Sequence, residues 1–302
     1  MWVGTAGIGP SPAHVKEVYT VISQLQEAGF PLAVVCHTLG VSRAGYYAYT
    51  QGGASPRAQE DARLRPVVQQ IFWEHKRRYG ARRIAAELSA RGEVCGPGRV
   101  ARLLKQLGLQ ALQPRSFRPR TTQSRHPLGY RPNPLLDSVP PSGINQVWLG
   151  DITYIPLAGA RFAYLALLMD LYSRRVVGWE LDDQMTEALV LAALRQAIRW
   201  RQPKPGLIHH TDRGGQYAGG DYRHVLRRAG MEQSMSRPDN CYDNAFMESC
   251  FGTIKTELEM QRYADRPTAQ AEIHEYLCYY DRRRRHSSLN YLTPCEFELR
   301  QS

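Results

Sequence analysis

The hydrophobic pattern divides the chain into a helical front half and a back half that contains strands. Before residue 113, apolar side chains recur every three or four positions, as in a helix over about 97–107 that places Val100, Leu103 and Leu104 on one face. After residue 146, apolar and polar positions alternate in short runs, which is typical of strands. The sequence therefore predicts all-α modules followed by an α/β domain.

The α/β part predicts a mixed five-strand sheet with flanking helices. We expect strands at about 147–155, 162–170, 174–181, 207–211 and 231–235, and a helix over about 186–201. The first three strands would form a meander, and the last two would complete the sheet. A further helix is expected from about Ala245 to Met260, with Asp243 or Asn244 as its N-cap.

Pattern and composition together predict four segments. These are an N-terminal helical segment (1–55), a second helical module (56–112), a Pro/Arg-rich linker (113–143) and the sheet domain with a C-terminal helical extension (144–302). In the first segment, Pro31–Leu39, a turn at Gly40 and a helix capped by Ser42 have the outline of a helix-turn-helix, which other helical hairpins share. The linker contains seven prolines and five arginines. It is therefore expected to be an extended basic tether.

Three carboxylates occupy positions that ordinary folding does not require. Asp151 lies in a predicted strand on the same face as Val147 and Leu149, where it interrupts an apolar row. Asp212 follows a short apolar run and precedes a Gly-rich loop, so it lies at the end of a strand. Glu248 lies in the first turn of the helix expected from about Ala245 to Met260, with 35 residues between it and Asp212.

These acids suit a metal-dependent reaction. Carboxylates brought together repel one another unless a divalent cation neutralises them. Hard oxygen ligands favour Mg²⁺ or Mn²⁺, and two such ions about 4 Å apart can activate an attacking oxygen and stabilise a leaving one. A single acid is ordinarily a surface residue, but Asp151, Asp212 and Glu248 together predict phosphoryl transfer on nucleic acid.

The same stretches resemble the transposases of the IS-three group of bacterial insertion sequences, within the class of DDE transposases and retroviral integrases. The matching segments are 145–154 (NQVWLGDITY), 210–217 (HTDRGGQY) and 234–248 (SMSRPDNCYDNAFME). The resemblance implies an RNase H-like catalytic core and a metal-binding triad of Asp151, Asp212 and Glu248. It also places a basic residue seven positions after the glutamate, here Lys255, which points the same way as Glu248 and can hold a DNA phosphate.

The resemblance continues into the C-terminal segment. The matching residues there are Tyr280, Arg284, His286, Leu289, Tyr291 and Pro294. Asp281 departs from the pattern, because the family usually has asparagine at this position, and Pro238-Asp239 replaces a common lysine–glycine pair. Neither departure touches the triad, so both concern the shape of the structure around it rather than the chemistry.

The charge distribution indicates a DNA partner. Residues 1–140 hold 19 Lys and Arg against 8 Asp and Glu, whereas residues 141–302 hold 20 of each. Basic groups supply the sequence-independent part of DNA affinity, although a solvated basic surface is the simpler alternative. The candidates for DNA contact besides Lys255 are Arg82, Arg83, Arg99, Arg102, Arg213 and Arg284.

The expected activity is cleavage at an element end by metal-activated water, followed by attack of the released 3′-OH on a second phosphodiester. The expected partners are the terminal repeats, target DNA, further copies of the chain on DNA and the product of any upstream reading frame. Two alternatives stay open. One is a nuclease of the same fold that never joins DNA, and the other is a domesticated DNA-binding protein whose triad no longer reacts.

Cysteine usage and hydropathy exclude other classes. The six cysteines form no C-x-x-C pair and no paired histidine spacing, so neither a zinc site nor a disulfide framework is indicated. The longest apolar stretch, Phe162 to Leu171, is too short to span a bilayer, and no signal-peptide pattern opens the chain. We therefore expect a cytoplasmic protein.

Overall fold

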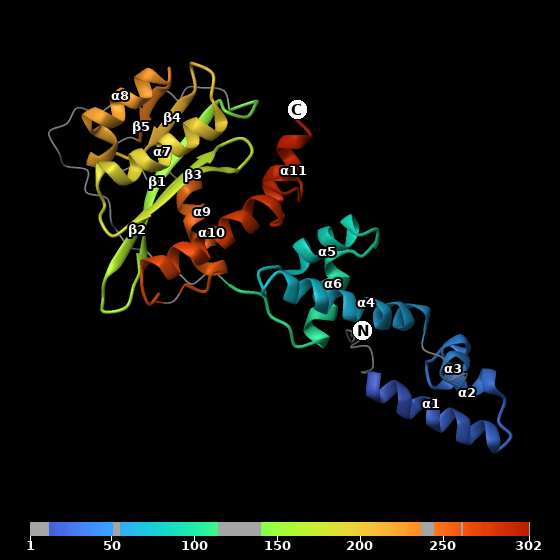
Figure 1. The fold of residues 1–302 in the computed structure, drawn as a ribbon. Helices are drawn as coiled ribbons and strands as arrows, with labels where there is room; N and C mark the ends of the chain where they lie inside the picture. Colours follow the sequence, from blue (N-terminus) through green and yellow to red (C-terminus); the bar gives the residue numbers. More distant parts are fainter. Residues whose placement is uncertain (1–11, 51–54, 114–139, 237–244, 261, 302) are drawn as a thin grey trace, which may run out of the picture. The chain divides into compact units, whose positions relative to one another are not determined.

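The computed structural model describes residues 12–50, 55–113, 140–236, 245–260 and 262–301. The chain forms two compact units, Met1–Gln69 and Gln70–Ser302, and their boundary falls inside helix α4 (Pro56–Glu74) (Figure 1). Most of the predicted linker, and the predicted cap at Asp243 or Asn244, lie outside the described residues. No helix in the described part of the chain has the length and apolarity needed to cross a membrane.

The first unit contains the predicted helix-turn-helix outline. Its helices are α1 (Pro12–Glu27), α2 (Leu32–Thr38) and α3 (Arg43–Thr50). They pack around a small core of Ile22, Val35, Cys36 and Tyr46. Gly40, in the turn between α2 and α3, has a φ of 67°, a conformation that favours glycine. The Ser42 hydroxyl accepts a hydrogen bond from the Gly45 N–H at 3.0 Å, which caps α3 as predicted.

The sheet of the second unit is mixed and has five strands. The strands are β1 (Val147–Pro156), β2 (Phe162–Asp170), β3 (Val176–Asp182), β4 (Ile208–Thr211) and β5 (Glu232–Met235), in the order β3-β2-β1-β4-β5. The first three pair antiparallel as a meander, and β4 pairs parallel with both β1 and β5. The predicted mixed five-strand sheet is therefore confirmed, with every strand within two residues of its expected bounds.

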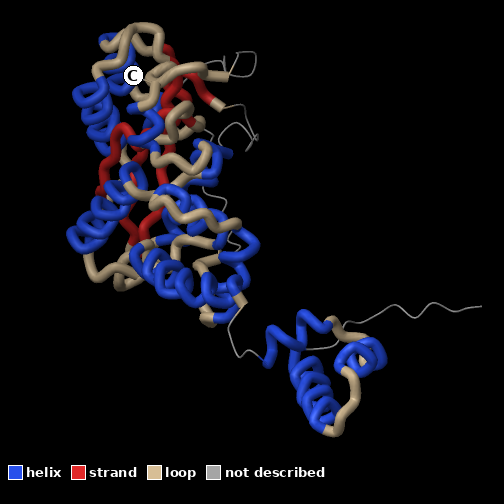
Figure 2. The backbone as a smooth tube through the Cα atoms, turned by 90° about the vertical axis from the view of Figure 1, so that its right-hand side faces the viewer, coloured by secondary structure: helices blue, strands red, loops and turns tan. Residues whose placement is uncertain are grey.

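Helices cover both faces of this sheet (Figure 2). Helices α7 (Glu187–Arg201) and α8 (Gly220–Arg228) pack on the face that carries Trp148. Helices α9 (Ala245–Glu257) and α10 (Arg266–Arg282) pack on the opposite face with Val147 and Leu149. The short helix α11 (Pro294–Leu299) follows α10. Because side chains alternate along β1, Asp151 shares a face with Val147 and Leu149, toward α9.

The helical region before the sheet contains α4, α5 (Ala81–Ala90) and α6 (Pro97–Gln106). Val100, Leu103 and Leu104 of α6 are buried, as the spacing predicted. Helix α9 ends earlier than the expected Met260, because Glu259 has a φ of 47° and turns the chain out of the helix.

Candidate active site

Parallel pairing of β1 with β4 brings Asp151 and Asp212 together. Gly150 pairs with Thr211 in this register, so Asp151 is the next residue of β1 and Asp212 directly follows the end of β4. Neighbouring strands lie about 4.8 Å apart. Both side chains are partly buried. The sequence pattern identified each acid, and the strand register makes them neighbours.

Short backbone contacts orient the two carboxylates. The Gly214 N–H donates to Asp212 Oδ1 at 2.9 Å, and the Ile152 N–H donates to Asp151 Oδ1 at 2.7 Å. A Cβ at position 214 would lie 3.0 Å from that Asp212 oxygen and 2.8 Å from Oε1 of Gln216. Glycine at position 214 therefore allows the loop to close tightly around Asp212.

Tyr217 lies beside the two aspartates and was not identified from the sequence as a site residue. It belongs to the 3-10 helix η2 (Gly215–Ala218) and is buried. Burial, and then the nearby Asp151 and Asp212, raise the pKa of its phenol well above the usual range. The phenol therefore stays protonated and adds no third negative charge. Its place in the motif HTDRGGQY, five residues after Asp212, was the available signal.

Lys255 lies on α9, which packs against β1, the strand that carries Asp151. Burial lowers the pKa of the Lys255 amine, and the Asp151 carboxylate acts in the opposite direction. This coupling places the ammonium within electrostatic range of Asp151. The side chain is partly buried, so Lys255 lies next to the predicted site rather than on a fully solvated helix face.

Glu248 is exposed in the first turn of α9, just after residues 237–244, which lie outside the described part of the chain. Among the residues that the structure describes, no three His, Cys, Asp or Glu side chains are close enough together to hold a metal ion. The structure therefore sets Asp151 beside Asp212, with Lys255 in electrostatic contact with Asp151, and leaves Glu248 apart from the two aspartates. Its role as the third ligand stays a prediction.

The predicted DNA-contact arginines divide into outward-facing and inward-facing residues. Arg82 is exposed, and Arg99 and Arg102 on α6 are partly exposed. Arg213 is partly buried, and its Nε donates to the carbonyl oxygen of Ser236 at 2.7 Å. These four keep their place as candidates for contact with DNA.

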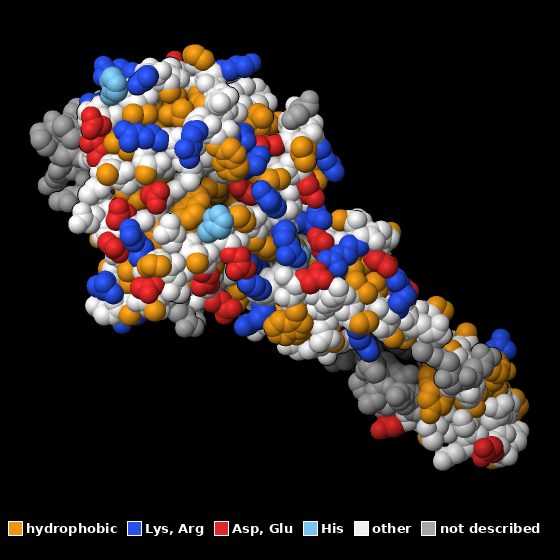
Figure 3. Space-filling model, in the orientation of Figure 1, with side chains coloured by type: hydrophobic (Ala, Val, Ile, Leu, Met, Phe, Trp, Pro, Cys, Tyr) orange, Lys and Arg blue, Asp and Glu red, His pale blue; other side chains and the backbone are white. Residues whose placement is uncertain are grey.

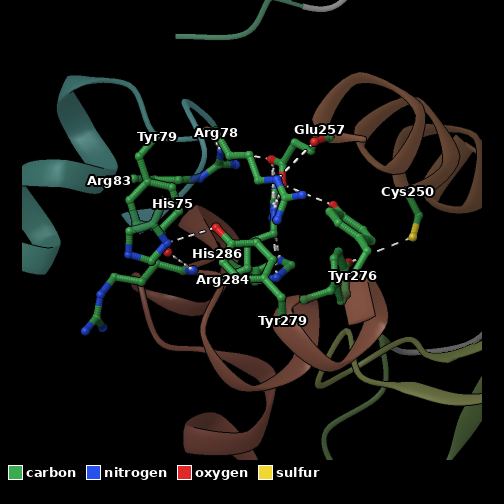
Figure 4. A network of polar contacts seen from close by, with 12 residues as sticks. His75, Arg78, Tyr79, Arg83, Cys250, Glu257, Tyr276, Tyr279, Arg284 and His286 are labelled. Atoms are coloured by element: carbon green, nitrogen blue, oxygen red, sulfur yellow. Dashed lines mark hydrogen bonds and ion pairs between the residues drawn. The ribbon is translucent and has the colours of Figure 1, made fainter. Parts of the chain in front are cut away.

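Arg284 and Arg83 require a correction. Arg284 is buried, and its Nη2 lies 2.7 Å from Oε1 of Glu257 (Figure 4). Arg83 also points inward, with Nη1 3.5 Å from the same oxygen and the guanidinium over the Tyr79 ring. The expectation that Arg284 binds DNA is wrong for this structure, because a buried carboxylate already holds its guanidinium. Arg83 faces the same Glu257 carboxylate, but at a longer distance and with a more exposed side chain than Arg284.

The location of the basic excess also needs refinement. Residues 1–55 contain two basic and two acidic residues, so all the excess of the front half lies in residues 56–140, with 17 basic against 6 acidic residues.

Several large apolar side chains of the first unit are exposed, including Phe30, Val34 and Tyr47. On the face shown in Figure 3, basic and acidic side chains are interspersed over the second unit.

Family models describe the two parts of the chain. Residues 141–241 and 229–294 each match a model described as Integrase core domain, and residues 58–117 match one described as HTH-like domain. Together with the mixed sheet and the adjacent aspartates, these matches define an integrase-core protein preceded by a helical, HTH-like region. The mixed five-strand sheet and the matches to the integrase core confirm the predicted RNase H-like core.

Relatives give the family. The chain is 38% identical over 283 residues to the Transposase InsF for insertion sequence IS3A of Escherichia coli (strain K12), covering 92% of this chain and 97% of the relative. It is 42% identical over 265 residues to the Insertion element IS600 uncharacterized 31 kDa protein of Shigella sonnei, covering 87% of this chain and 97% of that protein. The chain belongs to the IS3 family of transposases.

A solved structure gives a more distant comparison. It is described as the HTLV-2 integrase catalytic core domain in complex with magnesium (trimeric form). The similarity covers 51% of this chain and 96% of that chain, with 15% sequence identity and a TM-score of 0.38.

Proposed function

We propose that this chain is an active transposase that cuts DNA at element ends and joins the released 3′-OH to a second phosphodiester. The observation that carries the proposal is the pairing of β1 with β4, which sets Asp151 and Asp212 side by side near Lys255. Two neighbouring carboxylates repel each other, and one ammonium cannot offset both charges and also hold a phosphate. The pair is therefore suited to a divalent cation with oxygen ligands.

We assign each residue of the proposed site a separate role in metal binding, DNA binding or orientation. Asp151 and Asp212 would hold the metal, and Glu248 would be the third ligand. Mg²⁺ or Mn²⁺, as one or two bound ions, supplies Lewis acidity for the attacking and leaving oxygens. Lys255 holds a DNA phosphate beside the carboxylates. The Gly214 N–H keeps Asp212 oriented, and the buried Tyr217 phenol closes one side of the site.

The experiment uses labelled element ends and Mg²⁺ with the full chain. Asp151→Asn, Asp212→Asn and Glu248→Gln should each abolish cleavage and joining and leave binding of the ends intact, because metal ligation needs charged oxygens. Glu259→Gln is the matched control, since Glu259 is exposed and lies near Arg77 at 3.7 Å, outside the triad. Normal joining by any one triad variant would remove that residue from the site.

The products of this experiment also distinguish the alternatives. Cleaved strands without joined products would indicate a nuclease of the same fold. Retained but uncut ends would indicate a silent DNA-binding protein. Two ends have to be held while one is cut, so we propose that at least two copies act together on DNA, with any upstream-frame product as a further partner. Chromosomal and plasmid DNA as substrate fits action in the cytoplasm.

A further inference from the structure

A buried polar network surrounds Glu257, the last residue of α9 (Figure 4). Nε of Arg284 donates to both carboxylate oxygens at 2.9 Å, and Nη2 donates to Oε1 at 2.7 Å. The Tyr276 hydroxyl donates to Oε2 at 3.0 Å. The side chains of Glu257 and Arg284 are 6% and 5% exposed, so water screens this ion pair weakly.

The HTH-like region contributes to the same network. Nη1 of Arg83 lies 3.5 Å from Oε1 of Glu257, and Nε of Arg78 donates to the Glu257 main-chain carbonyl at 2.9 Å. The Tyr79 hydroxyl donates to the Arg283 carbonyl at 2.9 Å and accepts from the Arg285 N–H at 2.7 Å. Segments 174 to 179 residues apart in sequence therefore meet at the end of α9.

The two histidines of the network are neutral. Burial lowers the pKa of His75 to about 4, and its Nδ1 lies 2.9 Å from the Tyr279 hydroxyl oxygen. Burial, and then Arg284, lower the pKa of His286 to about 2. Near neutral pH the Glu257 carboxylate therefore offsets Arg284 and Arg83 without added positive charge from either ring. This arrangement holds the end of α9 through charge and directed hydrogen bonds.

Glu257 lies on the same helix as two residues of the proposed catalytic site. Glu257 lies two residues after Lys255 and nine residues after Glu248 on the same helix. An α-helix advances about 1.5 Å and rotates about 100° per residue. Small shifts or rotations of α9 at Glu257 therefore move Lys255 and Glu248 relative to Asp151.

We propose that Glu257 is a positioning residue that ties the catalytic helix α9 to the HTH-like region, so that DNA held by that region meets Lys255 and the triad in a fixed geometry. This inference rests on the proposed strand cleavage. A buried ion pair is seldom more stabilising than apolar residues of the same volume. Convergence of Arg78, Arg83 and Arg284 on one residue is better suited to fixing geometry than to adding stability.

The test compares Glu257→Gln with Glu259→Gln in the full chain. Glutamine keeps the shape of Glu257 and removes its charge. We expect end affinity within about twofold of the unsubstituted chain and a single-turnover cleavage rate at saturating DNA at least about tenfold lower, because misplacement of about 1 Å can cost that much. Amide hydrogen exchange should rise in α9 and stay unchanged in β1 and β2. Glu259→Gln should match the unsubstituted chain in all three measurements.

A second variant keeps the test informative if Glu257→Gln does not fold. Arg83→Gln removes the contact from the HTH-like side at a residue whose side chain is 27% exposed. It should lower the saturated cleavage rate and leave affinity unchanged. Loss of affinity with a full rate at saturation would instead assign Arg83 to DNA contact and overturn the proposal.

The Asp151→Asn variant distinguishes failure of the positioning role of Glu257 from failure of the proposed catalytic site. If Asp151→Asn is inactive and Glu257→Gln cleaves at the full rate, the positioning role is wrong and the catalytic site stands. If Asp151→Asn cleaves normally, the proposed catalytic site itself is wrong.

Discussion

At the residue scale, Asp281 shows what a departure from the family pattern means in three dimensions. It is buried on α10, and its Oδ1 accepts the N–H of Val176 on the edge strand β3 at 3.1 Å. Burial raises the pKa of Asp281 to about 7, with Arg175 opposing and Glu298 adding to the shift. The carbonyl oxygen of an asparagine could accept the same hydrogen bond without burying a charge.

We expect Asp281→Asn to stabilise the protein at pH 8 and to have little effect at pH 4. The folded-state pKa lies above the unfolded value, so folding binds a proton between about pH 4 and 7 and stability falls as pH rises through that window. The gain at pH 8 should be on the order of 2–4 kcal/mol, because asparagine buries no charge at this position. Urea unfolding at both pH values measures it. An equal change at the two pH values would contradict the assignment.

At the element scale, the packing of α7 on the sheet depends on Gly178 in β3. A Cβ at this position would lie 2.4 Å from the carbonyl oxygen of Ala193 and 2.9 Å from Cβ of Ala197, both on α7. The sequence pattern predicted the strand and the helix, but not how closely they approach. A glycine in a strand often marks such a contact.

Gly178→Ala should therefore lower the free energy of unfolding by about 1–3 kcal/mol, because α7 has to move away from the sheet. Gly252→Ala is the matched control. Gly252 lies inside α9 with no heavy atom within 4 Å of the added Cβ, and alanine should stabilise the helix by about 1 kcal/mol. Thermal unfolding of the two variants compares them. Unchanged stability of Gly178→Ala would mean that α7 shifts at no cost.

At the scale of the whole molecule, the charge and the network assign different roles to the parts of the front half. Residues 1–55 carry no net charge, whereas residues 56–140 carry all the basic excess. Residues 75–83 are joined to α9 and α10 within the second unit. A cut near residue 140 would therefore leave buried Glu257 without the contacts of Arg78 and Arg83.

Deletion of residues 1–55 should leave the salt dependence of DNA binding nearly unchanged, because phosphate contacts determine that slope. Binding of labelled element ends is measured against salt concentration for the full chain and for the shortened chain. A much shallower slope after the deletion would show that the first unit supplies the phosphate contacts. That result would overturn the assignment of DNA affinity to residues 56–140.

The sequence by itself determined the features that depend on local periodicity and on short motifs. Alternation identified β1, an apolar run identified β2, and helical spacing identified α6 and α7, because these patterns report which faces of an element are buried. The motifs around Asp151 and Asp212 identified both acids, and the pairing of β1 with β4 then set Asp151, within β1, beside Asp212, which directly follows β4.

Only the tertiary structure decided which charges are buried and which elements hold them. Arg284 was indistinguishable from its neighbours in a run of four arginines, yet it alone of the four pairs with Glu257. A signal existed in α9, where Glu257 falls on the stripe of Cys250, Ile254 and Leu258. An acid on an apolar stripe indicates a buried partner but does not name it. The partner depends on contacts between distant segments, and periodicity along one helix does not encode them.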